Sequence, residues 1–133
     1  MSPARSIGMA LLFVVALTLG AGCKGGGKAD PQVQAQEQQL KDIQEMYFLF
    51  VKEHNKPPTQ MPDLANKQFE GIYPATVQAL EKGKYEVIWG INSKDGGTLL
   101  AYEKAAAATE GLGVMADGSV RKVTADQVKA AKK

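Results

Sequence analysis

The feature that most constrains the fold is an apolar stripe at helical spacing that ends before a pair of prolines. Its positions recur every three or four residues, at Leu40, Ile43, Tyr47, Phe50 and His54. This spacing predicts one buried face of a helix. Asp30-Pro31 provides an N-cap acceptor followed by proline in the first turn, and Pro57-Pro58 cannot continue the helix. The sequence therefore predicts a long helix that starts at Pro31 and stops before Pro57.

Two apolar residues of this segment, Phe48 and Leu49, lie off the stripe. They predict either a helix end that is buried on two sides or a contact with a partner. We favour two-sided burial, since most apolar side chains belong to a core.

The segments between the long helix and the first strand are short. Thr59 to Asn66 reads as a loop with one helical turn. Pro74 to Lys82 is predicted to be a short helix, with Gly83 at the C′ position.

From Lys84 the pattern changes to that of strands. Tyr85–Gly90 and Thr98–Glu103 are predicted as an antiparallel pair around a turn at 92–97. Lys104 to Glu110 is compatible with a short helix or a loose connection. Asp117-Gly118, between strands predicted at 112–116 and 119–123, predicts a type I′ hairpin. Thr124 and Gln127 form a capping box that opens a last helix.

This order of elements predicts an α+β fold: a long N-terminal helix on an antiparallel sheet of about four strands, with a short C-terminal helix. Leu40, Ile43, Tyr47 and Phe50 are expected to lie on one face of the sheet.

The N-terminus has the pattern of a secretory signal. Arg5 precedes a thirteen-residue apolar stretch, Ile7–Leu19, which ends in Gly20-Ala21-Gly22. The alternative, a permanent membrane helix, needs about 20 apolar residues. Residues 1–22 are therefore expected to be a signal peptide.

The residue after this segment is Cys23, the only cysteine of the chain. Ala21-Gly22-Cys23 resembles the lipobox of bacterial lipoproteins, with Gly20 in place of the usual leucine. The resemblance implies that the Cys23 thiol is acylated with fatty acid such as palmitate; the alternative is a free thiol. Residues 23–30 would be the lipid attachment and a glycine-rich tether of roughly 15 Å, and residues 31–133 a single domain. The match of 22–29 to a phosphate loop is rejected, because Ala29 replaces the Ser or Thr that binds magnesium.

The composition of the mature chain narrows the range of partners. It has 111 residues, with 15 basic and 14 acidic side chains once Arg5 is removed. This balance argues against a nucleic-acid partner, which requires a basic surface. The membrane, through the lipid, and another envelope protein are the expected partners.

Residues with catalytic or metal-binding chemistry are few. His54 is the one histidine, and we interpret it as a helix-end or partly buried side chain. Ser93 and Ser119 lie in predicted turns without a nucleophile motif, and Asp117 is assigned to the turn. No catalytic residue, metal or cofactor is therefore expected, although a carboxylate pair is not excluded.

Two further side-chain groups have alternative roles. Asn92 and Asp95 could bind calcium, but they lack the spacing and number of ligands of an EF-hand. Trp89 and Tyr85 are interpreted as core or cross-strand residues rather than a ligand platform.

Two stretches resemble a known family. Residues 43–50, followed by Lys56-Pro57-Pro58 and Pro62-Asp63-Leu64, resemble the helix and proline segment of type II secretion pseudopilins. Residues 113–123 resemble the C-terminal H-x9-D-G motif of prepilin-like exported proteins, with Ala107 at the histidine position. The resemblance implies a pilin-like head in the cell envelope. The short apolar stretch and Cys23 replace the long retained helix of a pilin, so no filament is implied.

Two functions are therefore expected for an anchored domain that faces the periplasm or the cell exterior. The first is a non-enzymatic interaction module, related to secretion or pili. The alternative is a lipoprotein that binds a small ligand or ion in a pocket between the helix and the sheet.

Overall fold

A long helix, α2 (Pro31–His54), forms where the apolar stripe predicts it. The Asp30 carboxylate accepts a hydrogen bond of 2.8 Å from the N–H of Gln32, as expected of an N-cap. The helix ends before Pro57, and Asn55 follows it with a positive φ of 57°. Both predicted ends of the helix are confirmed.

The computed structural model describes residues 30–92 and 94–132. The predicted signal peptide, Cys23 and the tether up to residue 29 lie outside the described residues, as does Ser93. The compact unit described below begins at Gln34, within α2.

Three short helices follow α2: α3 (Met61–Leu64), α4 (Lys67–Ile72) and α5 (Pro74–Glu81). The helical turn after Thr59 and the helix at Pro74 were both predicted, whereas α4 was not. Gly83 ends α5 with a φ of 77°, and the Lys84 N–H donates to the Ala79 carbonyl at 3.0 Å. This pattern is a Schellman motif, which confirms the C′ role of Gly83.

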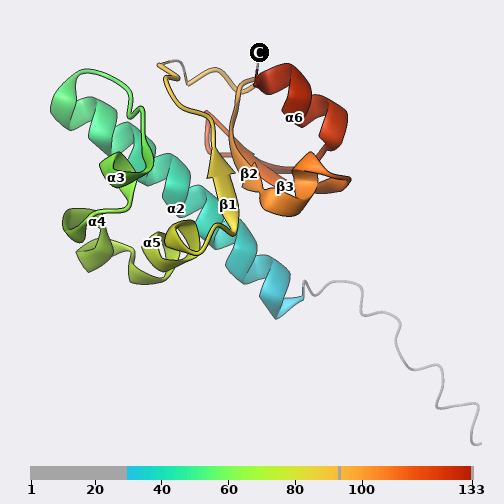
Figure 1. Ribbon diagram of the computed structural model, residues 1–133, viewed down its shortest axis with the longest axis horizontal. Helices are drawn as coiled ribbons and strands as arrows, with labels where there is room; N and C mark the ends of the chain where they lie inside the picture. The colour runs from blue at the N-terminus through green and yellow to red at the C-terminus, as the bar shows by residue number, and fades with distance from the viewer. Residues whose placement is uncertain (1–29, 93, 133) are drawn as a thin grey trace, which may run out of the picture. The chain divides into compact units, whose positions relative to one another are not determined.

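The second half of the chain forms a four-stranded antiparallel sheet in the order β1-β2-β3-β4. The strands are β1 (Tyr85–Val87), β2 (Leu99–Glu103), β3 (Glu110–Met115) and β4 (Val120–Thr124). A 3-10 helix, η2 (Lys104–Ala107), joins β2 to β3, and α6 (Ala125–Ala131) closes the chain. Figure 1 labels α2 to α6 and three of the strands, and the elements together confirm the predicted α+β fold.

The first strand is shorter than predicted, because it ends at Val87 rather than Gly90. The Ile88 N–H still donates to the Leu100 carbonyl of β2 at 2.8 Å, but the backbone beyond it bonds to other elements. The Ile88 carbonyl accepts from the Tyr47 hydroxyl, and the Gly90 N–H donates to the Pro58 carbonyl at 3.1 Å. Trp89 therefore lies in a loop, half-buried against the core, and not in a cross-strand pair.

The β3–β4 hairpin is confirmed, but its predicted type I′ turn is wrong. Such a turn needs positive φ at both Asp117 and Gly118. Gly118 has a φ of 93°, while Asn55 is the one non-glycine residue with positive φ among residues 30–92 and 94–132. The Gly118 N–H donates to the Met115 carbonyl, and the Met115 N–H to Ser119. These bonds define a three-residue loop in which only the glycine adopts the left-handed conformation.

The predicted capping box of α6 is confirmed. The Gln127 N–H donates to Thr124 Oγ1 at 3.3 Å, and the Thr124 N–H donates to Gln127 Oε1 at 2.9 Å. The two side chains thus satisfy two backbone donors that the first turn of a helix leaves unpaired.

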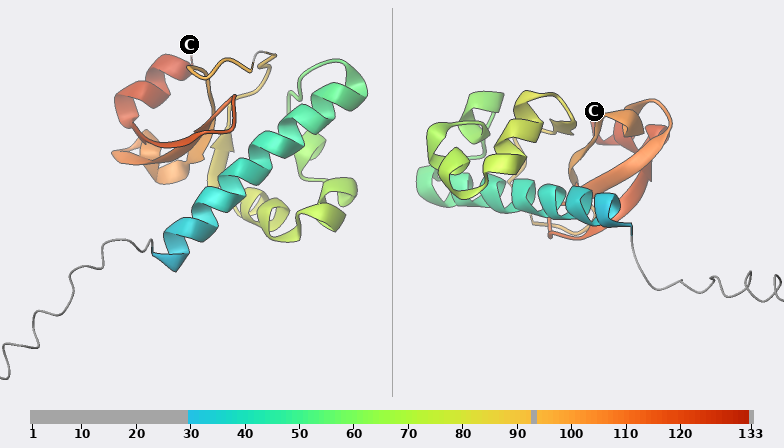
Figure 2. Two further views of the ribbon diagram at one scale, coloured as in Figure 1. Left: turned by 180° about the vertical axis from the view of Figure 1, so that it is seen from behind. Right: turned by 90° about the horizontal axis from the view of Figure 1, so that it is seen from below.

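The two faces of the sheet are covered by different helices (Figure 2). The apolar stripe of α2 packs on one face of the sheet, together with residues of α3–α5. This core cluster includes Leu40, Ile43, Met46, Tyr47 and Phe50 of α2 and Leu100 and Val114 of the sheet. The other face packs against η2 and α6 through Leu99, Tyr102, Ala106, Met115, Val123 and Val128. The predicted placement of the stripe on one sheet face is confirmed. His54 is the exception, since it lies exposed at the helix end.

The Tyr47 hydroxyl connects α2 to the loop that follows β1. It donates to the Ile88 carbonyl at 3.0 Å and accepts from the Ile91 N–H at 2.8 Å. The ring itself is fully buried. One side chain of α2 therefore fixes both the inner packing and the course of residues 88–91.

Replacing Tyr47 by Phe should keep the ring in place and leave two backbone groups without a partner. We expect a loss of about 1–3 kcal/mol in the free energy of unfolding, measured by urea denaturation. Amide exchange at Ile91 should accelerate. Tyr85→Phe is the control, because the Tyr85 hydroxyl has a single side-chain partner, Gln39 Oε1 at 2.7 Å. Equal losses in the two variants would contradict this role of Tyr47.

The chain has four tyrosines, and all four have a raised pKa. Burial is the largest cause in each case. Nearby carboxylates add to it at three of them. The pKa of Tyr73, beside Glu45, and that of Tyr85, near Glu103, both rise to about 12, and Glu86 raises the pKa of Tyr102. The folded state therefore favours the neutral phenols.

Stability should consequently fall as the pH rises from 10 to about 12, because the unfolded chain loses phenolic protons that the folded chain retains. The tyrosinate absorbance of the native protein should rise at a higher pH than that of the unfolded chain. The chain unfolded in guanidinium should titrate at the ordinary pKa of about 10. A native tyrosinate step at the ordinary pKa would contradict the expectation.

Candidate interaction site

The described residues considered for catalysis are His54, Ser119 and Asp117; all three are used in local structure, and His54 lies on a different element from the other two. His54 stacks on Phe50 with ring centroids 4.1 Å apart, and its Nδ1 lies 3.2 Å from the Phe50 carbonyl oxygen. The Ser119 hydroxyl donates to Asp117 at 2.7 Å in the β3–β4 loop. The hydrogen bonds that Ser119 donates to Asp117, from its hydroxyl and its backbone N–H, lower the pKa of the Asp117 carboxyl. Asp117 thus has the turn role that the sequence predicts.

The calcium candidates do not form a ligand cluster. The Asp95 carboxylate accepts from the Gly97 N–H at 3.1 Å, and its carbonyl accepts from Thr98. Asn92 is exposed in the same loop. Among residues 30–92 and 94–132, no three His, Cys, Asp or Glu side chains come close enough to hold a metal ion.

A groove runs between α6 and the start of β2, and we call it the α6 groove. It consists of two adjoining hollows of about 310 and 390 Å³, which share Gly97, Leu99 and Ala131. Leu99, Met115 and Val123 are nearly buried and belong to the core beneath it. The remaining lining residues are Gln127, Ala130, Ile88, Trp89, Ile91, Thr98 and Lys132. Apolar side chains of the sheet, the loop and α6 thus meet at one accessible place.

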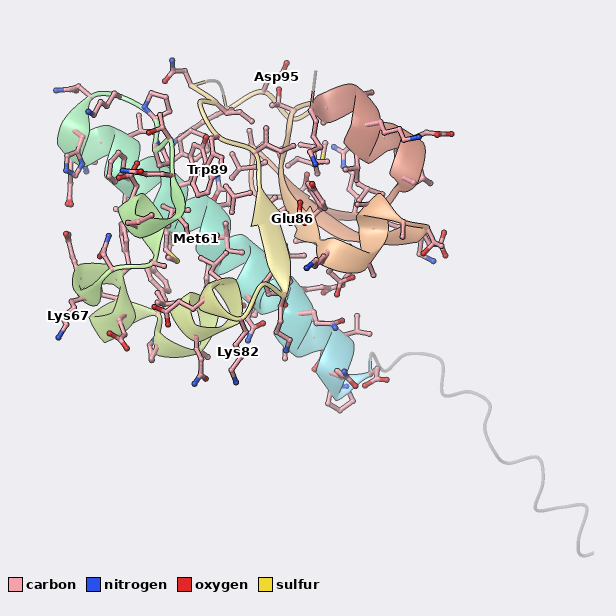
Figure 3. The ribbon with its side chains drawn as sticks, viewed as in Figure 1. Met61, Lys67, Lys82, Glu86, Trp89 and Asp95 are labelled. Carbon is pink, nitrogen blue, oxygen red and sulfur yellow. The ribbon has the colours of Figure 1, made fainter. Side chains whose placement is uncertain are left out.

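Two polar side chains of the α6 groove, those of Gln127 and Lys132, already have partners. Gln127 Oε1 accepts from the cap of α6, and Lys132 Nζ lies 3.9 Å from Glu86 Oε1. The same Glu86 oxygen accepts from the Tyr102 hydroxyl at 2.9 Å. Figure 3 shows Glu86 on β1 and Trp89 further along the following loop. The Gln127 and Lys132 side chains are therefore already engaged within the domain.

The pocket expected between the long helix and the sheet is filled. Leu40, Ile43, Met46 and Leu100 are completely buried in this region. The open hollows instead lie beside α6. Sequence reasoning missed them, because a groove depends on how the ends of distant elements meet and leaves no periodic pattern.

The structure shows no helix long and apolar enough to span a membrane within the residues it describes. Comparisons of the chain with protein-family models, with curated proteins and with solved structures give no match.

Proposed function

We propose that this chain is an exported lipoprotein, anchored through Cys23, whose domain works by binding another protein of the cell envelope. The proposal depends on one feature of the sequence: a short apolar stretch is followed by small residues and then by the single cysteine. An anchor of this kind restricts the domain to a membrane surface, where a binding partner is concentrated.

The arrangement of the domain supports a binding role over a catalytic one. The described histidine, serine and aspartate considered for catalysis serve helix-end and turn structure. The α6 groove, by contrast, presents apolar side chains of the loop after β1 and of α6 beside one another. Accessible apolar surface of this kind is typical of sites where proteins meet.

The small-ligand alternative is supported by one observation, the size of the α6 groove, since hollows above about 300 Å³ fall in the range of ligand pockets. Binding of a polar ligand would also need convergent polar groups. Gln127 and Lys132 would have to leave their present partners to provide them.

The proposal is tested by purifying the full-length lipoprotein from membranes after mild crosslinking in cells. We expect the same envelope protein in independent preparations. Recovery of no reproducible partner would count against a binding role.

A further inference from the structure

A second surface lies on α2, around the two apolar residues that depart from the helical stripe. Phe48 and Leu49 are half-buried: they pack on the core and also line a hollow of about 210 Å³. Lys52 and Lys94 line the same hollow and are exposed, as is Glu45, while Gln44 is half-buried. We call Phe48, Leu49, Lys52 and Lys94 the α2 patch. Phe48 and Leu49 are therefore neither fully buried nor fully exposed.

The hollow at the α2 patch carries a net positive charge, because it has two lysines and one acid, Glu45. Lys94 Nζ lies 5.1 Å from the centroid of the Phe48 ring, which is a cation–π distance. The ion pairs of the described chain involve Lys122 and Lys132, not Lys52 or Lys94. The one acid of the hollow, Glu45, accepts a hydrogen bond from the Tyr73 hydroxyl. Two lysines therefore border an apolar floor with no carboxylate partner.

We propose that the α2 patch binds an acidic segment of a partner protein, with one apolar side chain seated on Phe48 and Leu49 and flanking carboxylates facing Lys52 and Lys94. This inference rests on the proposed function and gives the partner a chemical class. Charge complementarity selects the acidic segment, and the hollow selects a protruding apolar side chain.

An anionic membrane surface would also attract two lysines, but the shape of the α2 patch favours a peptide. Side chains that enter a bilayer project from the surface, whereas Phe48 and Leu49 form the floor of a hollow.

The test is a titration of the full-length chain, in detergent micelles, with a fluorescent Glu-Glu-Phe-Glu-Glu peptide. Binding should be saturable, weaken with salt and shift the amide signals of Phe48, Leu49 and Lys94. The double variant Lys52→Glu, Lys94→Glu should weaken it about tenfold or more. A peptide with Ala in place of Phe should bind more weakly.

The matched control is Lys67→Glu with Lys82→Glu, which makes the same change in net charge on exposed residues at α4 and α5 (Figure 3). It should leave the affinity unchanged. Equal weakening by both pairs, or absence of saturable binding, would overturn the inference. It would also be overturned if, in nanodiscs, phosphatidylglycerol shifted the Leu49 and Lys94 signals and the peptide did not. A partner captured by crosslinking would leave the proposed function standing in each of these cases.

Discussion

Cys23→Ala should abolish incorporation of labelled palmitate and release the protein from the membrane fraction. The thiol is the acceptor that lipidation requires, and alanine offers no nucleophile in its place. Labelling should be lost completely, because Cys23 is the only cysteine of the chain and no other thiol can take the acyl group. Labelling in cells followed by fractionation measures both effects.

Gly20→Leu is the matched control for this experiment, since it restores the leucine that the lipobox usually has. Its labelling should equal or exceed that of the natural sequence. Palmitate that remained on Cys23→Ala, or a natural chain that took up none, would favour the free-thiol interpretation of Cys23.

Ile43→Ala should destabilise the domain by about 2–5 kcal/mol, the range for truncating a buried isoleucine or leucine to alanine. Ile43 is completely buried, in the cluster that joins α2 to the sheet and to α3–α5. The neighbours that surround it come from several elements, so collapse around the cavity would be limited. Urea denaturation measures the loss, and a small domain of this kind can lose much of its stability in this way.

Ile72→Ala makes the same chemical change on α4, where the isoleucine is 59% exposed. Its effect should stay within about 0.5 kcal/mol. If the two variants lost similar stability, the assignment of the core to the α2 stripe would be wrong.

The long helix and the order of elements could be predicted because they depend on local signals. The α2 stripe, the Asp30 cap, Gly83 and the Thr124 capping box each act within one or two turns of the chain. The conformational preferences of residues within one or two turns can be predicted from the neighbouring sequence alone.

The predictions failed where distant contacts decide the local conformation. Ile88 and Trp89 favour a strand, yet β1 ends before them. The Ile88 N–H still bonds to Leu100 of β2, but the Ile88 carbonyl and the Gly90 N–H bond to Tyr47 and Pro58. At Asp117 the aspartate-glycine pair correctly indicated the hairpin. The loop nevertheless has three residues, so that Asp117 does not need positive φ. Tertiary contacts and turn length thus overrode propensity at these positions.

The two candidate surfaces differ in how far the sequence indicated them. Phe48 and Leu49 were marked by their departure from the stripe, although Lys94 comes from a loop more than forty residues later. The α6 groove combines Trp89, Leu99 and Ala131, which share no pattern in the sequence. Only the folded chain brings these side chains together.

Photo-crosslinking in living cells tests the central claim, binding by an anchored domain, most directly. A photoreactive residue would replace Ala130 in the α6 groove, Leu49 in the α2 patch or, as a control, the exposed Lys67 on α4. The proposed function predicts an adduct with one envelope protein from Ala130 or Leu49 and none from Lys67. The absence of any protein adduct from both surfaces, or equal adducts from all three positions, would contradict it.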